Sequence, residues 1–398
     1  MMIRKHPQFL MVLAALLGLS FARVNHPAPA LKDAFSGLFL IGAALNESQF
    51  SGRDTLGSAI VANQFNSVTP ENVLKWENVH PEPDRYNFGP ADRYVEFGER
   101  HHMFIVGHTL IWHNQTPSWV FGQGSVPEMD RYNNLKQGEG KRADRETLLG
   151  RMRDHITTVV SRYKGRVNGW DVVNEALNGD GTLRQTPWMK GIGEDYLIKA
   201  YEFAQEADPG AELYYNDFST ENPMKRAGAI ALVKNLLAHG IRLAGVGIQG
   251  HYRMDWPSTV LLDSAITDFS RLGVKVMITE LDVDVLPAAT WNRDADVRLR
   301  ASADPRLNPY ASGLPDSLQR ALGERYADLF GVFTRHAGVL SRVTFWGVRD
   351  GDSWLNNWPV PGRVNYPLLF NRNGACKAAY DSVMNVAMRR SDHSQGQN

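Results

Sequence analysis

The sequence is poor in cysteine and has no excess of charge of either sign. One cysteine, Cys376, stands among 398 residues, so no disulfide can form within the chain and stability has to come from a packed core. Cys376 has no cysteine or histidine close to it in the sequence, so it is interpreted as a structural thiol and not as a nucleophile. Lys plus Arg and Asp plus Glu both number 43. This balance argues against a nucleic-acid partner, which normally requires a clustered basic excess.

Apolar runs long enough to span a membrane are also lacking. The apolar run at residues 9–19 follows a basic start and is shorter than the roughly 18–20 residues that a bilayer span needs. We therefore predict a secretory signal peptide over residues 1–22, with small residues at 20 and 22 as one candidate cleavage site and those at 28 and 30 as a second. A membrane anchor is the alternative. The mature protein is expected to be secreted or periplasmic, free of the membrane and monomeric, with a polar C-terminal tail at residues 389–398.

Between residues 31 and 388, segments typical of strands alternate with segments typical of helices. Strands are predicted at residues 38–42, 67–69, 103–108, 167–174, 211–216, 244–249, 274–280 and 343–346. Helices are predicted between them, among others at 148–163, 196–207, 225–239 and 258–272. Eight such units indicate a single (β/α)₈ TIM barrel of the α/β class. A doubly wound open sheet is the alternative, but no glycine-rich phosphate loop follows any of these strands.

Two of the predicted strands end at a glutamate. The segment 274–280 is rich in β-branched residues and ends at Glu280, and the strand at 167–174 leads into Glu175. A buried carboxylate is costly unless it has a partner or a reacting ligand. Cleavage of a glycosidic bond needs a pair of carboxylates, one to donate a proton and one to attack or to activate water. A surface charge or an ion pair would explain one such glutamate, but two favour a catalytic pair.

The other predicted strands also end in polar or aromatic residues. The active-site loops of a barrel all follow the carboxyl ends of its strands, so these residues are expected to share one face. Indole rings stack on the apolar faces of sugars, and amide, amine and carboxylate groups bond to sugar hydroxyls. The pattern therefore favours a sugar polymer as the substrate.

The strand-end motifs resemble those of glycoside hydrolase family 10, the retaining endo-β-1,4-xylanases. They read TPENVLKW (69–76), GHTLIWHNQTPSW (107–119), WDVVNEAL (170–177), YYNDF (214–218), GIQGHY (247–252), VMITELDV (276–283) and FWGVRDGDSWL (345–355). The resemblance implies xylan and xylo-oligosaccharides as substrates, no cofactor and no metal. It implies Glu175 as the acid/base and Glu280 as the nucleophile. It further implies that the sugar subsites contain Glu71, Asn72, Lys75, His108, Trp112, Asn174, Tyr215, Gln249, His251, Trp346 and Trp354.

The chain departs from the family pattern in two places. Phe218 and Ser219 stand where the family usually has tyrosine and asparagine, and the loop at 121–143 carries no recognisable motif. The loss of a hydroxyl and an amide after the fifth strand predicts weaker binding of the leaving-group side of the substrate.

The proposed roles also predict local structure around the two glutamates. His251 is expected to form a hydrogen bond that keeps Glu280 ionised, and the charge of Glu280 is expected to raise the pKa of Glu175. Asn174 is expected to bond to the 2-hydroxyl of the sugar. Strand alternation would turn Asn174 and Glu175 to opposite faces, so we expect a bulge or the end of the strand there.

Three other functions remain open. A secreted carbohydrate-binding protein would use the same tryptophans but would not need both glutamates. A metal-dependent hydrolase is suggested by His108, His113, Asp217 and His251, although their spacing matches no common metal motif. A hydrolase of β-1,4-glucan or mixed-linkage glucan could be built on the same barrel, since a hexose differs from xylose by one hydroxymethyl group.

Overall fold

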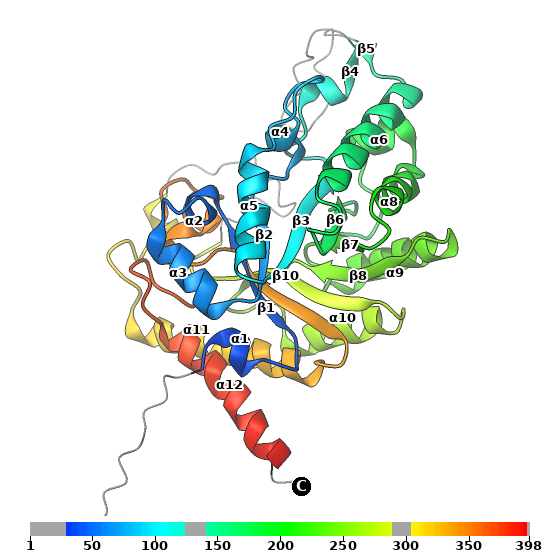
Figure 1. Cartoon of the computed structure of the whole chain (residues 1–398). Coiled ribbons are helices and arrows are strands. Elements are labelled where there is room, and N and C mark those ends of the chain that lie inside the picture. The colour runs from blue at the N-terminus through cyan, green and yellow to red at the C-terminus, as the bar shows by residue number, and fades with distance from the viewer. Residues whose placement is uncertain (1–28, 124–140, 289–303, 396–398) are drawn as a thin grey trace, which may run out of the picture.

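The computed structural model describes residues 29–123, 141–288 and 304–395 (Figure 1). Within these residues, eight parallel strands form a closed ring, since β11 pairs with both β1 and β10. The strands are β1 (Leu40–Leu45), β2 (Ser67–Pro70), β3 (Phe104–Ile111), β6 (Gly169–Asn174), β7 (Glu212–Asp217), β8 (Leu243–Ile248), β10 (Lys275–Asp284) and β11 (Leu340–Phe345). Each overlaps a predicted strand. The prediction of a single (β/α)₈ barrel is therefore confirmed.

Helices surround the barrel, and polar side chains cap several of them. They are α1 (Leu31–Ala34), α2 (Glu47–Phe50), α3 (Thr55–Gln64), α4 (Trp76–Val79), α5 (Gly89–Arg100), α6 (Arg145–Arg162), α7 (Pro187–Ile192), α8 (Tyr196–Ala207), α9 (Pro223–Ala238), α10 (Thr259–Ser270), α11 (Asp316–Arg335) and α12 (Ala378–Gln395). Asp144 accepts the N–H of Thr147 where α6 begins, and Ser258 accepts that of Leu261 where α10 begins. The four predicted helices correspond to α6, α8, α9 and α10.

Short elements lie in the loops at the carboxyl ends of the strands. They are β9 (His251–Arg253), which pairs with the end of β10, the antiparallel pair β4 (Gly122–Gln123) and β5 (Lys141–Arg142), and the 3₁₀ turns η1 (Ser118–Val120), η2 (Pro305–Leu307), η3 (Asp350–Asp352) and η4 (Trp354–Asn356). Most of the predicted loop at 121–143 lies outside the described residues.

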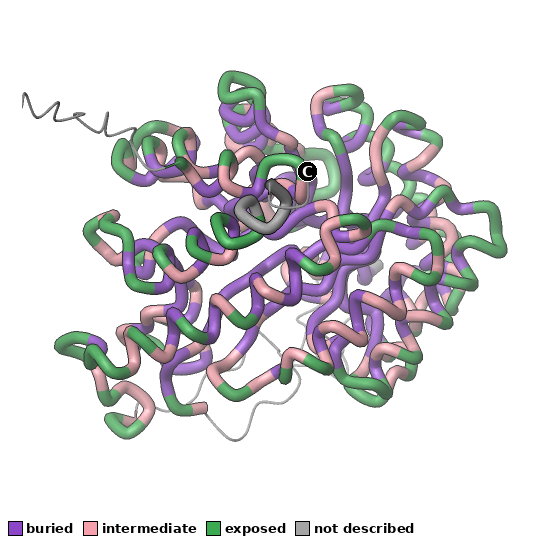
Figure 2. Tube along the Cα trace, turned by 90° about the horizontal axis from the view of Figure 1, so that it is seen from below, coloured by how far each residue is buried: buried purple, intermediate pink, exposed green. Residues whose placement is uncertain are grey.

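Side chains are tightly packed between the strands and the surrounding helices. The indole of Trp170 lies so close to Gly107 that a Cβ atom there would be 2.0 Å from the ring, so only glycine fits. The hydroxyl of Tyr94, on α5, lies 2.8 Å from the carbonyl oxygens of both Val68 and Val106, which share its one hydrogen. Figure 2 shows buried residues along the strands and the inner helix faces, with exposed residues outside. This rigid core holds the strand ends in place.

Both ends of the chain bear on the sequence predictions. The predicted signal peptide at 1–22 lies outside the described residues. Helix α12 packs against α11 and continues to Gln395, so much of the predicted tail at 389–398 is helical. In the part of the chain that the structure describes, no helix is both long and apolar enough to cross a membrane.

Candidate active site

A cavity of about 180 Å³ lies at the carboxyl ends of the strands. It is lined by Glu71, Asn72, Lys75, His108, Trp112, Gln115, Asn174, Glu175, Gln249, His251, Glu280, Trp346 and Trp354. Every predicted site residue except Tyr215 is among them. The barrel thus brings together side chains from segments far apart in the sequence, and Glu175 and Glu280 face one space, although β10 continues past Glu280 to Asp284.

The end of β6 turns two consecutive residues into this cavity. Pairing between β6 and β7 shifts register between Asp171 and Val173, and the strand ends at Asn174. Glu175 follows with φ +58°, in the left-handed region that non-glycine residues rarely adopt. The predicted bulge or strand end is present here, and it explains how Asn174 and Glu175 both reach the cavity.

Glu175 is buried and accepts two hydrogen bonds. Its Oε2 accepts the indole N–H of Trp112 at 2.8 Å, and its Oε1 accepts the amide of Gln249 at 3.0 Å. Burial and the nearby charge of Asp217 raise the pKa of Glu175, although the two donors and Arg184 oppose that rise. A raised pKa was predicted, but from the charge of Glu280. The prediction was wrong about the cause, because burial is the main one and Asp217 is the carboxylate that adds to it.

Glu280 is equally buried, but its surroundings favour the charged form. Its Oε2 lies 3.1 Å from Nε2 of His251, and its Oε1 accepts the side-chain amide of Asn216 at 2.8 Å. Burial alone would raise the pKa of Glu280. The His251 hydrogen bond, the charges of His108 and His251 and the Asn216 amide outweigh burial and lower it. The pKa values of two glutamates in one cavity are therefore shifted in opposite directions.

His251 sits between two carboxylates. While Nε2 faces Glu280, Nδ1 lies 3.1 Å from Oδ1 of Asp282, whose Oδ2 accepts the indole N–H of Trp354 at 2.7 Å. Burial would lower the pKa of His251, but Asp282 and Glu280 raise it to about 10. Both ring nitrogens consequently donate at neutral pH, and His251 acts as a fixed positive charge beside Glu280.

Asn174 links the surroundings of the two glutamates. Its Oδ1 accepts one N–H from the side chain of Asn216 at 2.9 Å and another from Gln249 at 3.3 Å. Asn216 also bonds to Glu280, and Gln249 also bonds to Glu175. The side-chain oxygen of Asn174 is thereby occupied, and its NH₂ group remains to donate to a ligand. Asn216 was not predicted as a site residue, although its position within YYNDF, opposite Asn174, was the available signal.

A second cluster of polar side chains lines the side of the cavity that is formed by the residues following β2. The ammonium of Lys75 donates to Asn72 Oδ1 at 3.1 Å and to Gln115 Oε1 at 2.8 Å, and it lies 5.1 Å from the ring centre of Trp112. Burial and Asp352 raise the pKa of Glu71 to about 7. Gln115 was missed in the sequence because it lies in a loop, three residues beyond the predicted Trp112.

Aromatic rings form the remaining walls. Trp346 meets the ring of His108 edge to face, with centroids 5.4 Å apart, and His108 is held by Asp171 at 2.9 Å. Trp354 stacks on Trp358 at a centroid distance of 4.7 Å. These rings offer flat apolar faces next to the carboxylates, as binding of a sugar requires.

Tyr215 lies outside the cavity. It is fully buried, and its hydroxyl donates to Oδ2 of Asp217 at 2.5 Å. The structure therefore places Tyr215 behind the site, where it supports Asp217.

The residues that suggested a metal site have separate partners. His108 bonds to Asp171, Asp217 to Lys225, and His251 to Glu280 and Asp282. In the ranges that the structure describes, no group of three or more His, Cys, Asp or Glu side chains could hold a metal ion.

Two further pockets differ in their relation to this site. One, of about 250 Å³, shares His251 and Trp354 with the cavity and is also lined by Phe218, Ser219 and Trp358. It continues the site past the fifth barrel strand, where the sequence departs from the family pattern.

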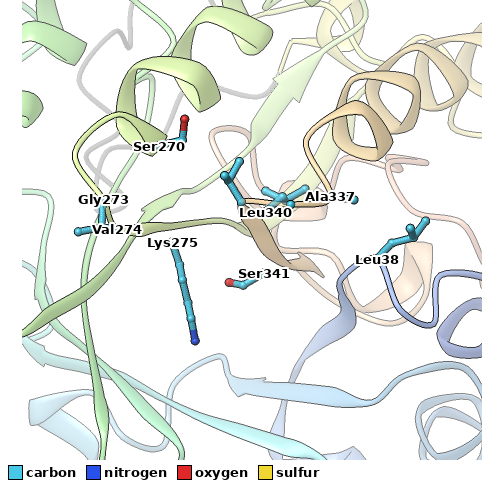
Figure 3. Close-up of a pocket in the computed structure, with 10 residues that line it drawn as sticks. Leu38, Ser270, Gly273, Val274, Lys275, Ala337, Leu340 and Ser341 are labelled. Atoms are coloured by element: carbon cyan, nitrogen blue, oxygen red, sulfur yellow. The ribbon is translucent and has the colours of Figure 1, made fainter.

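The other pocket, of about 490 Å³, lies at the opposite end of the barrel, where β10 and β11 begin. Figure 3 shows Leu38, Lys275 and Ser341 around it. The ammonium of Lys275 donates to Glu212 at 2.7 Å. No carboxylate is among the described residues that line this pocket, so its larger volume does not make it the reaction site.

Comparison with known proteins agrees with this geometry. Residues 30–386 match glycosyl hydrolase family 10. Endo-1,4-beta-xylanase A of Xylanibacter ruminicola is 41% identical over 383 residues, which cover 96% of this chain and 99% of that protein. A beta-1,4-xylanase of Dictyoglomus thermophilum is 37% identical over 390 residues, with 96% and 99% covered. The structure of a GH10 endoxylanase from a sugarcane soil metagenome has a TM-score of 0.81 at 39% identity, covering 90% of this chain and 99% of that one. The chain therefore belongs to glycosyl hydrolase family 10.

Proposed function

We propose that this protein is a retaining endo-1,4-β-xylanase that hydrolyses internal bonds of xylan and xylo-oligosaccharides. The observation that carries the proposal is the pair of buried glutamates in one cavity, with the pKa of Glu175 raised and that of Glu280 lowered. Family membership supports the retaining mechanism, and relatives named as endo-1,4-beta-xylanases support xylan as the substrate.

In the first step, Glu280 attacks the anomeric carbon and Glu175 gives its proton to the leaving oxygen. Glu280 is suited to attack because His251 and Asn216 hold its two oxygens and keep it ionised. Glu175 is suited to donate because burial raises its pKa and so favours the protonated form. The bond from C1 to the leaving oxygen breaks as the bond from C1 to a Glu280 oxygen forms.

In the second step, the roles of Glu175 reverse. Once Glu280 is esterified its negative charge is gone, and Glu175, now ionised, removes a proton from water. The water attacks C1 and releases Glu280, so two inversions give net retention. The NH₂ group of Asn174 is placed to donate to the 2-hydroxyl, a contact that strengthens in the oxocarbenium-like transition state.

Binding on the leaving-group side is proposed to be weaker than on the other side. Phe218 lines the adjoining pocket with a ring that has no hydroxyl, and Ser219 is shorter than asparagine. One lost hydrogen bond costs about 0.5–1.5 kcal/mol, or roughly two- to tenfold in affinity. Cleavage patterns of end-labelled xylo-oligosaccharides would measure this asymmetry, and stronger subsites on the leaving-group side would contradict it.

Product analysis on xylan and on carboxymethyl-cellulose tests the function as a whole. We expect a rapid fall in the viscosity of xylan, xylo-oligosaccharides as products, and new chain ends that appear first as the β-anomer by NMR. Chain-end release of xylose without early loss of viscosity would rule out internal cleavage. Faster hydrolysis of the cellulose derivative would favour a glucanase.

The segment at residues 1–22 is proposed to direct export and to be removed. Its basic start and short apolar run support this reading. N-terminal sequencing of protein recovered from the medium and from a periplasmic extract tests it. An intact N-terminus at residue 1 in the cell pellet alone would contradict export.

A further inference from the structure

A buried ion pair lies behind the active cavity. Lys225, in the first turn of α9, places Nζ 2.7 Å from Oδ1 of Asp217, the last residue of β7, and both side chains are completely buried. Removing two charges from water is costly unless their geometry is tight and their remaining bonding capacity is satisfied. The proposed mechanism uses neither residue, so this pair calls for an explanation.

Asp217 is held from several directions. Its Oδ1 accepts the backbone N–H of Phe218 at 2.9 Å in addition to the ammonium of Lys225, and its Oδ2 accepts the hydroxyl of Tyr215. A carboxylate with three donors cannot turn without breaking a buried hydrogen bond. The side chain of Asp217 is therefore a fixed charge.

The backbone of the same strand end supports Glu175. The carbonyl oxygen of Asn216 accepts the N–H of Glu175 at 3.0 Å. The carbonyl oxygen of Asp217 accepts the N–H of Gln249, also at 3.0 Å, and the side chain of Gln249 donates to Glu175. Displacing Asp217 would therefore move two supports of the acid/base residue.

Lys225 also holds one wall of the adjoining pocket. Its ammonium lies 3.4 Å from the ring centre of Phe218, a close cation–π contact in a site without water access. Phe218 in turn lines the pocket next to the cavity. One lysine thus contacts both the carboxylate near Glu175 and the aromatic wall on the leaving-group side.

We propose that Lys225 is a positioning residue for the reaction. It neutralises and clamps Asp217, and through Asp217 it controls the negative charge near Glu175 and the hydrogen bonds that support Glu175. The proposal rests on the proposed role of Glu175 as the acid/base. Asp217 raises the pKa of Glu175, second only to burial. Other charged groups near Glu175 are Arg184, from the segment after β6, Lys75, from the segment before α4, and Glu280, which lines the same cavity.

The test measures kcat/KM as a function of pH. It compares the alkaline limb of that profile, where kcat/KM falls as pH rises, between single and double variants. In Lys225→Met the charge of Asp217 is uncompensated, so Glu175 should keep its proton to higher pH. In Asp217→Asn the carboxylate is gone and a buried ammonium remains, so the limb should move to lower pH. The alkaline limb of the double variant should lie at a pH between those of the two single variants. On that limb we expect the two single variants to differ at least about threefold in relative kcat/KM, since half a pH unit is a factor of about three.

Two further variants separate positioning from a general structural role. Lys225→Arg keeps the charge and should retain the wild-type limb. Lys199→Met removes a lysine of α8 that pairs with Glu202 at the surface, and it should leave the limb unchanged. Where Lys225→Met does not fold, as judged by circular dichroism, the comparison of Asp217→Asn with the double variant still tests the proposal. Coinciding limbs in all folded variants, whatever their activity, would overturn it.

A direct titration makes the outcome independent of the substrate. The carboxyl carbon of Glu175 can be followed by NMR in protein labelled with ¹³C-glutamate, with its signal assigned by Glu175→Gln. Opposite shifts of that titration in the two single variants would support the proposal even if xylan is not cleaved. No activity of the wild type on xylan would overturn the proposed function alone. Unchanged titration in an active enzyme would overturn this inference alone.

Discussion

Nε2 of His251 lies 3.1 Å from Oε2 of Glu280, and this contact favours the charged form of both side chains. The histidine is raised to a pKa of about 10 while the pKa of the glutamate is lowered, although both are buried. A buried carboxylate without such a partner would take up a proton near neutral pH and lose its nucleophilicity. The pair is therefore the structural basis of an ionised nucleophile at a buried position.

Glu280→Ala is expected to abolish hydrolysis of xylan while the protein stays folded, because a residue tuned for chemistry contributes little to stability. Azide should restore turnover of an activated aryl xyloside and yield a glycosyl azide of inverted configuration. Near wild-type activity of the variant on xylan would contradict the assignment of the nucleophile. Circular dichroism and thermal unfolding control for loss of fold.

Glu175→Ala should slow substrates with poor leaving groups much more than substrates with good ones. With an aryl xyloside whose phenol needs no protonation, the first step should remain fast and the glycosyl-enzyme should accumulate, whereas xylan hydrolysis should fall by roughly 10²-fold or more. Pre-steady-state release of the phenol measures the first step. Equal losses on activated and natural substrates would count against Glu175 as the acid/base.

The His251 charge should make stability depend on pH in the alkaline range. Its folded pKa of about 10 lies above the ordinary value of 6.5, so its contribution is complete below pH 6.5 and is lost as pH rises toward 10. The slope for one proton is at most about 1.4 kcal/mol per pH unit. Urea unfolding of the wild type and of His251→Gln between pH 6 and pH 10 measures it. If the free energy of unfolding depends on pH in the same way in the two proteins, the histidine is not charged in the fold.

His155 should have the opposite effect in the acid range. It is fully buried, stacks on Trp76 with centroids 3.6 Å apart, and places Nδ1 3.2 Å from Nδ1 of His80. Burial and His80 hold the pKa of His155 well below 6.5, so its contribution is present above that pH and is lost as pH falls. Wild-type stability should therefore decline below pH 6.5 more steeply than that of His155→Phe.

A histidine at the surface provides the control for that measurement. His239 is exposed at the end of α9, and His239→Gln should follow the wild-type curve. Each curve is obtained from urea unfolding between pH 4.5 and pH 7.5. An identical pH dependence in His155→Phe and the wild type would show that the His80–His155 pair does not resist protonation.

The sequence alone was sufficient for the architecture and for the two carboxylates. Strands can be recognised from local residue patterns, and their alternation with helices specifies a barrel. The carboxyl ends of all the strands of such a barrel lie on one face. Glu175 and Glu280 could thus be placed together, and ordered motifs supplied the family. Twelve of the predicted site residues line one cavity, because each lies in the carboxyl-terminal half of a barrel strand or in the loop that follows it.

Only the tertiary structure decided what surrounds each carboxylate. The cause of the raised pKa of Glu175 is burial together with Asp217, which lies 42 positions later in the chain. The link from Glu280 through Asn216 to Asn174, and the burial of Tyr215 away from the cavity, were likewise not predicted. Hydrogen bonds and desolvation depend on ångström-scale distances between segments that are remote in sequence. Local periodicity fixes which face a residue is on, but those distances are set only when the barrel closes.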